Sequence, residues 1–318
     1  MGMNGNKIVA FPFGAALPGR NLIGGTPLIP PMGLSDSVAT AFERGGKREL
    51  PNGVRREANL AYREGAGNGY LLDVVWTCEP HGRVPVVFYF NSGSFHRSNR
   101  GRALGLCSIL SKRDLVVINC QFPDLSRSSG ADAALNAVMD ILLWTAEHAA
   151  DYRMDLDRVY AAGSSYGALM AVWTALLCNT RRLPEVLGRG AVPFRLRGLG
   201  LFNGMTDTES GDRIMRSISK SIAKVEARNK PLGEAMRPWA NHDLRTLPPV
   251  YQVTSDSDPS RPDILRMNAL LDKNAVVHDT LEFDTGIMAL SGFMEDHASG
   301  NECARIISKM FGFFAGNQ

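Results

Sequence analysis

The chain has 318 residues, of which 44% are apolar and 21% charged, and its formal net charge is +3. This composition is typical of a folded globular protein and excludes a disordered or fibrous chain. The charge is small for this length, and the arginine pairs carry no interleaved aromatic residues, so we expect no nucleic-acid partner.

The cysteines indicate neither a disulfide framework nor a zinc site, because they are odd in number, scattered and without C-x-x-C spacing. They are Cys78, Cys107, Cys120, Cys178 and Cys303. We expect them to be buried thiols in a reducing compartment, which indicates a cytoplasmic protein. No apolar run approaches the roughly 18 residues that a membrane span requires. The oligomeric state, a homodimer included, stays open.

Residues 1–55 are interpreted as an N-terminal arm or cap. The opening apolar stretch is interrupted by Pro12 and Gly14, which favours an ordered or fraying arm over a signal peptide. Within the arm, Ser35 precedes a short apolar face over 35–45, which predicts a short surface or cap helix.

From residue 56 to 318 the pattern predicts one α/β domain. Alternating residues over 56–64 and 70–77, separated by "GAGNG", predict an antiparallel strand pair. Continuous apolar runs typical of strands buried on both faces follow at 84–90, 114–120, 158–163, 196–204 and 248–255. Helix-length segments separate most of them, so we predict a mostly parallel, twisted sheet with helices on both faces.

Two of the intervening segments have clear helical periodicity. Residues 130–152 place apolar side chains at a 3.6-residue spacing, which predicts an amphipathic helix. Residues 206–246 are long and polar, but an apolar stripe of Ile214, Ile218, Ile222 and Val225 runs through them. We interpret this segment as an inserted helical cap; a surface helix packed on the body explains the stripe equally well.

The pentapeptide Gly163-Ser164-Ser165-Tyr166-Gly167 follows a predicted strand and begins a predicted helix. A G-x-S-x-G nucleophile elbow needs this context, because its turn is too tight for side chains at the glycines and presents the serine hydroxyl above the sheet. The pattern therefore predicts Ser165 as a nucleophile. A serine-bearing strand-to-helix turn without chemistry is the alternative.

A small-residue loop follows the strand that ends near residue 90. Acyl transfer needs N–H donors directed at the developing oxyanion, and such loops let backbone amides approach it. We predict that Gly93 and Ser94, with the N–H of Tyr166, form this oxyanion hole. The residues expected to contact the substrate are Asn91, Phe95 and His96. A merely flexible loop is the alternative.

An acidic turn, "VTSDSDPSRPD", follows the strand predicted over 248–255. Asp258 is the better candidate for the acid of a catalytic triad, and Asp256 is the second. Both aspartates would also serve as N-caps of a helix that begins near Pro262, without any catalytic role.

The motifs "NSGSF", "GSSYG", "SDSDPSR" and "SGF", in this order, resemble the hormone-sensitive-lipase-like branch of the α/β-hydrolases. Members of that branch carry H-G-G-G, G-x-S-x-G, D-P-x-x-D and H-G-F in the same order, and the resemblance covers roughly residues 56–318. It implies an α/β-hydrolase fold and a carboxylesterase acting on a small ester or acyl substrate, with no metal and no organic cofactor. It also implies that Ser165 is the nucleophile, Asp258 the acid, and Gly93 with Ser94 the oxyanion loop.

The sequence departs from that branch at two places. Asn91 and Ser92 stand where the family has His-Gly, which leaves backbone donors in the loop. Ser291 stands at the position of the family's catalytic histidine. In a Ser-His-Asp site the imidazole takes the serine proton, and its loss leaves on the order of 10³ to 10⁴ over the water reaction.

Other histidines are candidates for a substitute base. His297 is nearest in sequence to Ser291, but six residues of helix would displace it by about 9 Å. His96 and His242 are further candidates, whereas His81, His148 and His278 are expected to be structural.

Three functions fit this pattern. The first is a serine-hydrolase-type enzyme with a non-standard or missing base. The second is a hydrolysis-deficient homologue that binds a ligand. The third is a non-hydrolytic lyase or cyclase whose oxyanion loop stabilises an enolate. Retention of Ser165 favours the first and third.

Overall fold

The computed structural model describes residues 50–65, 67, 69–77, 82–91, 99–123, 130–210, 212–240, 242–283, 293–296 and 298–317. The helix expected over 35–45 lies outside these residues. The first strand begins at Val54, two residues before the predicted start of the domain.

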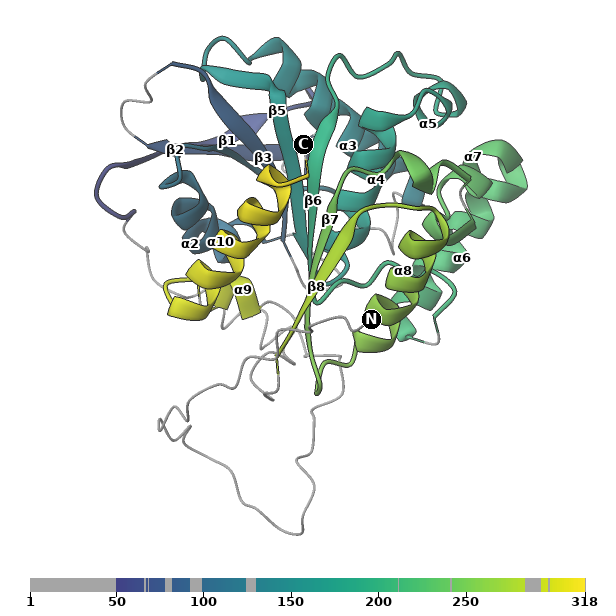
Figure 1. Cartoon of the computed structure of the whole chain (residues 1–318). Helices are drawn as coiled ribbons and strands as arrows, with labels where there is room; N and C mark the ends of the chain where they lie inside the picture. The colour runs from purple at the N-terminus through teal and green to yellow at the C-terminus, as the bar shows by residue number, and fades with distance from the viewer. Residues whose placement is uncertain are drawn as a thin grey trace, which may run out of the picture.

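Eight strands form one sheet in the order β1-β2-β4-β3-β5-β6-β7-β8 (Figure 1). They are β1 (Val54–Ala61), β2 (Leu71–Thr77), β3 (Val84–Phe90), β4 (Val116–Cys120), β5 (Met154–Ser164), β6 (Leu196–Phe202), β7 (Val250–Ser255) and β8 (His278–Phe283). β2 pairs antiparallel with β1 and β4, and the other neighbours pair parallel. The predicted mostly parallel sheet with an antiparallel pair at its start is confirmed.

The apolar runs form strands because their side chains are buried on both faces of the sheet. In β3, Val86 and Phe88 pack into the core on one face, and Val87 and Tyr89 pack into the core on the other. This alternation is the two-residue period of a strand.

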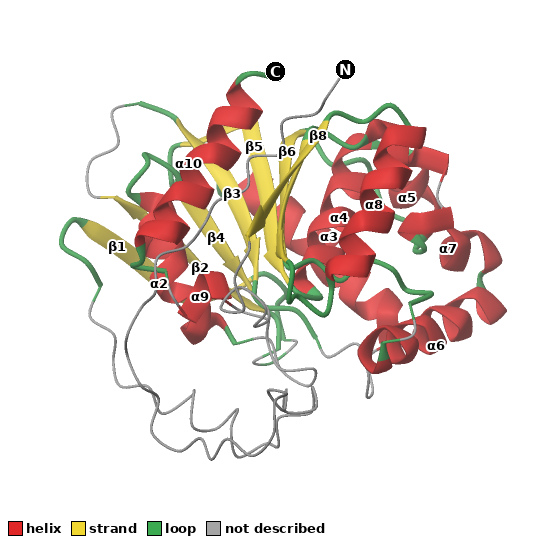
Figure 2. Ribbon diagram, turned by 60° about the horizontal axis from the view of Figure 1, so that its bottom comes forward, coloured by secondary structure: helices red, strands yellow, loops and turns green. Residues whose placement is uncertain are grey.

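Helices cover both faces of the sheet (Figure 2). They are α2 (Arg100–Ser111), α3 (Gly130–Glu147), α4 (Gly167–Asn179), α5 (Arg182–Val186), α6 (Arg213–Arg228), α7 (Lys230–Ala235), α8 (Arg261–Lys273), α9 (Phe293–Asp296) and α10 (Asn301–Ala315), with 3₁₀ turns η1 (Pro238–Ala240) and η2 (His242–Thr246). Helices α2, α9 and α10 lie on one face, and α3, α4 and α8 lie on the other. Within the described residues no helix is both long and apolar enough to cross a bilayer.

Helix α3 ends at Glu147, five residues earlier than the periodicity predicts. Arg153 has a left-handed φ of 53°, and β5 begins at the next residue, so the chain reverses between the two elements. The early start of β5 was not predicted because the residues before Val159 are largely polar and half-exposed.

The segment inserted between β6 and β7 contains α6, α7, η1 and η2. The predicted stripe is confirmed at Ile218, Ile222 and Val225, which are buried. These helices lie beside α3, α4 and α5, and the indole N–H of Trp173 in α4 donates to the carbonyl of Met236 at 2.9 Å. This packing fits helices attached to the flank of the body, and a covering role over the site stays a prediction.

Candidate active site

The polar residues of the candidate site form a row at the carboxyl edge of the parallel strands. Phe90 pairs with Gly163, Ser164 with Phe202, and Phe202 with Val253. The residues that follow these pairs are Asn91, Ser165, Asn203 and Thr254. Parallel α/β sheets bind their ligands at this edge, so the register brings together residues far apart in the chain.

The turn at Ser165 has the geometry of a nucleophile elbow. Ser165 has a left-handed φ of 53°, which is rare for a residue other than glycine. A Cβ at Gly163 would lie 2.2 Å from the carbonyl oxygen of Gly167, and one at Gly167 would lie 2.3 Å from that of Phe90. Both positions therefore require glycine, as the sequence pattern predicts.

The last residue of β6 and the loop that follows it hold the backbone of Ser165 from two sides. The Ser165 N–H donates to the carbonyl of Phe202 at 2.9 Å, and the Met205 N–H donates to the carbonyl of Ser165 at 3.0 Å. The strained residue is thus fixed by hydrogen bonds to a neighbouring segment, which stabilises a conformation the chain would otherwise leave.

The Ser165 side chain is buried, with 4% of its surface exposed. Among the described residues its hydroxyl contacts the thioether of Met205, with an Oγ–Sδ distance of 3.4 Å. A thioether is a weak acceptor, so this contact holds the hydroxyl in place without taking its proton.

Asp258 is buried and accepts four hydrogen bonds from the chain. Its Oδ1 accepts from the N–H of Ser260 at 2.9 Å and from the Ser260 hydroxyl at 2.7 Å. Its Oδ2 accepts from the Asn203 amide and from the Thr254 hydroxyl, both at 2.7 Å. The competing candidate, Asp256, is exposed, so burial favours Asp258 as the carboxylate of the site.

Tyr166 immediately precedes α4, where the backbone N–H groups of a helix begin. A helix N-terminus carries partial positive charge and favours a negative group near it. Ala168 and Leu169 donate their N–H groups to the carbonyls of Ser165 and Tyr166, both at 3.0 Å, which fixes this first turn. The position of Tyr166 is compatible with its predicted role in an oxyanion hole.

Asn91 is fully buried at the end of β3. Its side-chain oxygen accepts from the N–H of Asn99 at 3.0 Å, and its side-chain amide donates to the carbonyl of Cys120 at 3.4 Å. The Asn91 side chain thus links the end of β3 to Asn99, the N-cap residue of α2, and to the end of β4. This observation assigns Asn91 a structural contact, and its predicted contact with substrate stays a prediction.

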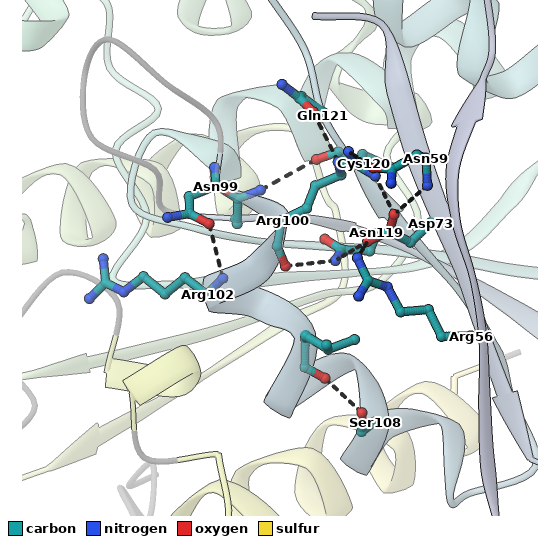
Figure 3. Close-up of polar contacts among 12 residues, drawn as sticks. Arg56, Asn59, Asp73, Asn99, Arg100, Arg102, Ser108, Asn119, Cys120 and Gln121 are labelled. Atoms are coloured by element: carbon teal, nitrogen blue, oxygen red, sulfur yellow. Dashed lines mark hydrogen bonds and ion pairs between the residues drawn. The ribbon is translucent and has the colours of Figure 1, made fainter. Parts of the chain in front are cut away.

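A charged network anchors the start of α2 (Figure 3). Asp73 in β2 is fully buried and pairs with the guanidinium groups of Arg56 and Arg100. Arg100 also donates to the side chains of Gln121 and Asn59, both at 2.9 Å. Arg100, the first residue of α2, is therefore firmly held.

Sequence reasoning missed a buried network beside the elbow. The hydroxyl of Tyr89 lies 2.7 Å from the Ser164 hydroxyl and donates to the Glu295 carboxylate in α9 at 2.7 Å. Burial, with a smaller contribution from Glu295, raises the pKa of Tyr89 well above its ordinary value, so the phenol stays protonated. The sequence offered one signal for this network, because Tyr89 carries a hydroxyl in an otherwise apolar strand and a buried hydroxyl needs a hydrogen-bond partner.

Two of the described histidines have structural contacts, in line with expectation. His148 stacks on Trp144, and its Nδ1 lies 2.8 Å from the Trp144 carbonyl. His278 pairs with Asp272 at 3.0 Å. Several predicted residues lie outside the described residues, namely His81, Gly93, Ser94, Phe95, His96, Ser291 and His297, and so does the side chain of His242.

The described cysteines, Cys107, Cys120, Cys178 and Cys303, are buried, as expected, and burial raises the pKa of each thiol. Within the described residues no group of His, Cys, Asp and Glu side chains gathers to hold a metal ion.

Sequence comparison identifies a family and related enzymes. The model of a family described as having the alpha/beta hydrolase fold matches residues 87–289. The chain is 26% identical over 234 residues to Esterase LipI of Mycobacterium tuberculosis, covering 68% of this chain and 69% of that protein. It is 24% identical over 209 residues to an acetyl esterase of Salmonella schwarzengrund, covering 62% of this chain and 59% of the relative.

Structure comparison shows the same fold. Esterase B of Lactobacillus rhamnosis superposes with a TM-score of 0.77 at 17% identity, covering 88% of this chain and 91% of that chain. A thermostable esterase of Pseudomonas putida superposes with a TM-score of 0.64 at 20% identity, and 93% of each chain is covered. The predicted fold class is therefore confirmed.

Proposed function

Because the chain belongs to the alpha/beta hydrolase fold family, we propose that it is a carboxylic ester hydrolase that attacks small acyl esters with Ser165. The observation that carries the proposal is the elbow, where a left-handed Ser165 lies between two positions that accept only glycine. The esterase names of the relatives support the reaction class.

In the proposed reaction, Ser165 Oγ bonds to the ester carbonyl carbon and the alcohol leaves with the serine proton. Water then cleaves the acyl-serine and restores the hydroxyl. The oxyanion that forms in each step is stabilised by backbone donors, for which we propose Tyr166 at the start of α4, together with Gly93 and Ser94.

We also propose that the reaction proceeds without the histidine of the related branch, since Ser291 occupies its position in the sequence. The remaining catalysis then comes from the oxyanion donors and substrate binding, which retain on the order of 10³ to 10⁴ over water when a triad member is lost. Activated esters with good leaving groups need the least help from a base, so they are the substrates of choice for a test.

The test is turnover of p-nitrophenyl acetate by the full chain and by Ser165→Ala. The expected result is slow hydrolysis that the substitution removes, with an unchanged circular dichroism spectrum. Equal rates in both proteins would overturn the assignment of Ser165. The matched control is Ser164→Ala, which removes the neighbouring hydroxyl and leaves the proposed nucleophile.

A ligand-binding protein without turnover is the second candidate. The saturation of Asp258 by donors of the chain favours it, because this carboxylate needs no imidazole partner. Calorimetric binding of acyl compounds by a protein that cleaves none of them would support this alternative.

A further inference from the structure

We propose that Asp258 and Asn203 form a positioning pair that fixes the backbone of Ser165, and that Asp258 does this in place of orienting an imidazole. The proposal rests on the proposed function for its catalytic consequence. Its structural part depends only on described residues at the ends of β6 and β7 and in the turns that follow β5, β6 and β7.

Donors of the chain occupy the acceptor sites of Asp258. An ionised carboxylate offers about four acceptor sites, two on each oxygen. Ser260 supplies two donors to Oδ1, and Asn203 and Thr254 supply two donors to Oδ2. An imidazole N–H that approached Asp258 would therefore have to displace one of these bonds.

The side-chain amide of Asn203 donates to Asp258 Oδ2 at 2.7 Å. Asn203 has a left-handed φ of 48°, and its N–H donates to the carbonyl of Val253 at 2.9 Å. Asparagine is among the few residues that tolerate this conformation. The hydrogen bond to a buried anion therefore holds a strained residue at the end of β6.

Residues on both sides of Asn203 bind the backbone of Ser165. The residue before it, Phe202, accepts the Ser165 N–H, and Met205, two residues after it, donates its N–H to the Ser165 carbonyl. Met205 also contacts the Ser165 hydroxyl through its sulfur. The hydrogen bond to Asp258 thus holds Asn203, and Asn203 lies within the segment 202–205 that binds the backbone of Ser165.

The experiment is a double-mutant cycle of Asp258→Asn and Asn203→Gly, with glycine chosen because it accepts a left-handed φ. Amide hydrogen exchange is followed in peptides that span Gly163–Gly167. Each single variant is expected to speed exchange of the Ser165 amide by about tenfold. Loss of a charge-assisted hydrogen bond should lower the free energy of local opening by about 1.4 kcal/mol, which corresponds to tenfold in rate. The double variant is expected to add less than threefold more.

Thr254→Val is the matched control, because it removes a donor to the same Oδ2, and within the described residues the Thr254 side chain makes no hydrogen bond to the segment around Ser165. We expect it to change this exchange less than threefold. Multiplying effects in the double variant, or exchange at Ser165 unchanged by Asn203→Gly, would overturn the positioning pair.

A pH profile of p-nitrophenyl acetate hydrolysis separates positioning from base orientation. For a positioning pair, both single variants lower kcat and keep the shape of the wild-type profile. An inflection between pH 5 and 8 that Asp258→Asn removes and Asn203→Gly keeps would show an oriented imidazole and overturn the proposal. A wild-type chain without turnover would refute the proposed function, and the exchange cycle would still decide the positioning pair.

Discussion

Asp73 and Asp258 are two buried carboxylates whose partners differ in charge. Asp73, on β2, pairs with the guanidinium groups of Arg56 and Arg100. Within the described residues Asp258 accepts only from neutral donors, two hydroxyls, an amide and a backbone N–H. Both hold chain segments that border the candidate site, one at the start of α2 and the other at the end of β6.

The difference indicates two uses of a buried charge. The cations at Asp73 offset the cost of burying the anion, and each loses its negatively charged partner if the anion is removed. The donors at Asp258 are neutral, so they satisfy its oxygens but bring no opposing charge to the carboxylate. We therefore expect Asp73 to matter chiefly for folding and Asp258 chiefly for the geometry of Ser165.

The largest expected effect is that of Asp73→Ala on stability. It leaves Arg100, whose side chain is 10% exposed, without its carboxylate, and breaking a buried pair in this way costs about 3–5 kcal/mol. Urea unfolding measures the change. The matched control is Asp155→Ala, which breaks the more exposed pair with Arg158 and should cost less than about 1 kcal/mol. Equal costs for the two variants would contradict the contrast.

A second prediction restores a base where the family has one. Ser291→His alone should raise ester hydrolysis little, because the acceptor sites of Asp258 are taken. Adding Thr254→Val opens a site on Oδ2, and a working general base contributes about 10² or more. Rates of p-nitrophenyl acetate hydrolysis test this. If Ser291→His alone hydrolysed the ester as fast as the double variant, Asp258 would still have an acceptor site open to the imidazole, and its four bonds would not saturate it.

A third prediction concerns the network that joins the elbow to α9. Tyr89→Phe removes the hydroxyl between Ser164 and the fully buried Glu295. Loss of one donor to a buried carboxylate should lower the free energy of unfolding by about 1–3 kcal/mol. Urea unfolding again measures it, with Tyr70→Phe at a half-buried ring as control. No difference between the two variants would show that the network adds nothing to stability.

The smallest expected effect is on the pH dependence of stability, through Asp263, which shares the cation Arg266 with Asp207. Asp263 in α8 lies near Asp207 and Asp212, and Arg266 pairs with both Asp263 and Asp207. Burial, followed by the charge of Asp207, raises the pKa of Asp263 to about 6. The folded state therefore holds this proton more tightly than the unfolded state, so stability from this group falls as pH rises from about 4 to 6.

Asp263→Asn should remove that dependence. Because the neighbouring Arg266 side chain is 49% exposed and solvent screens the charges there, the loss of stability between pH 4 and 7 should shrink by only about 1 kcal/mol relative to wild type. Urea unfolding at the two pH values measures it, and Asp114→Asn, at an exposed site, should leave the difference unchanged. An unchanged pH dependence in Asp263→Asn would show that this proton binds equally well in both states.

The sheet and its helices were predictable because buried positions are apolar and recur at the spacing of a strand or a helix. The apolar run 84–90 forms β3, and its alternate residues pack into the core on opposite faces of the sheet. The elbow was predictable because its turn accepts only glycine at positions 163 and 167. Strand ends set by polar residues, such as the start of β5 at Met154, carried no such pattern.

The site was predictable only in part. Ser165 directly follows β5, and Asp258 lies three residues after the end of β7, so local sequence was enough to propose both. The roles of Asn203 and Glu295 depend on contacts across 55 and 206 residues of sequence, and no local pattern encodes which donor meets which carboxylate. The order and register of the strands determine which of these side chains can form hydrogen bonds.

Covalent capture of the nucleophile tests the central claim most directly. The full chain is incubated with a fluorophosphonate, and the modified residue is located by mass spectrometry of its peptides. The account predicts a single adduct on Ser165 and none in Ser165→Ala. A folded chain that stays unmodified, or an adduct that persists in Ser165→Ala, would contradict it.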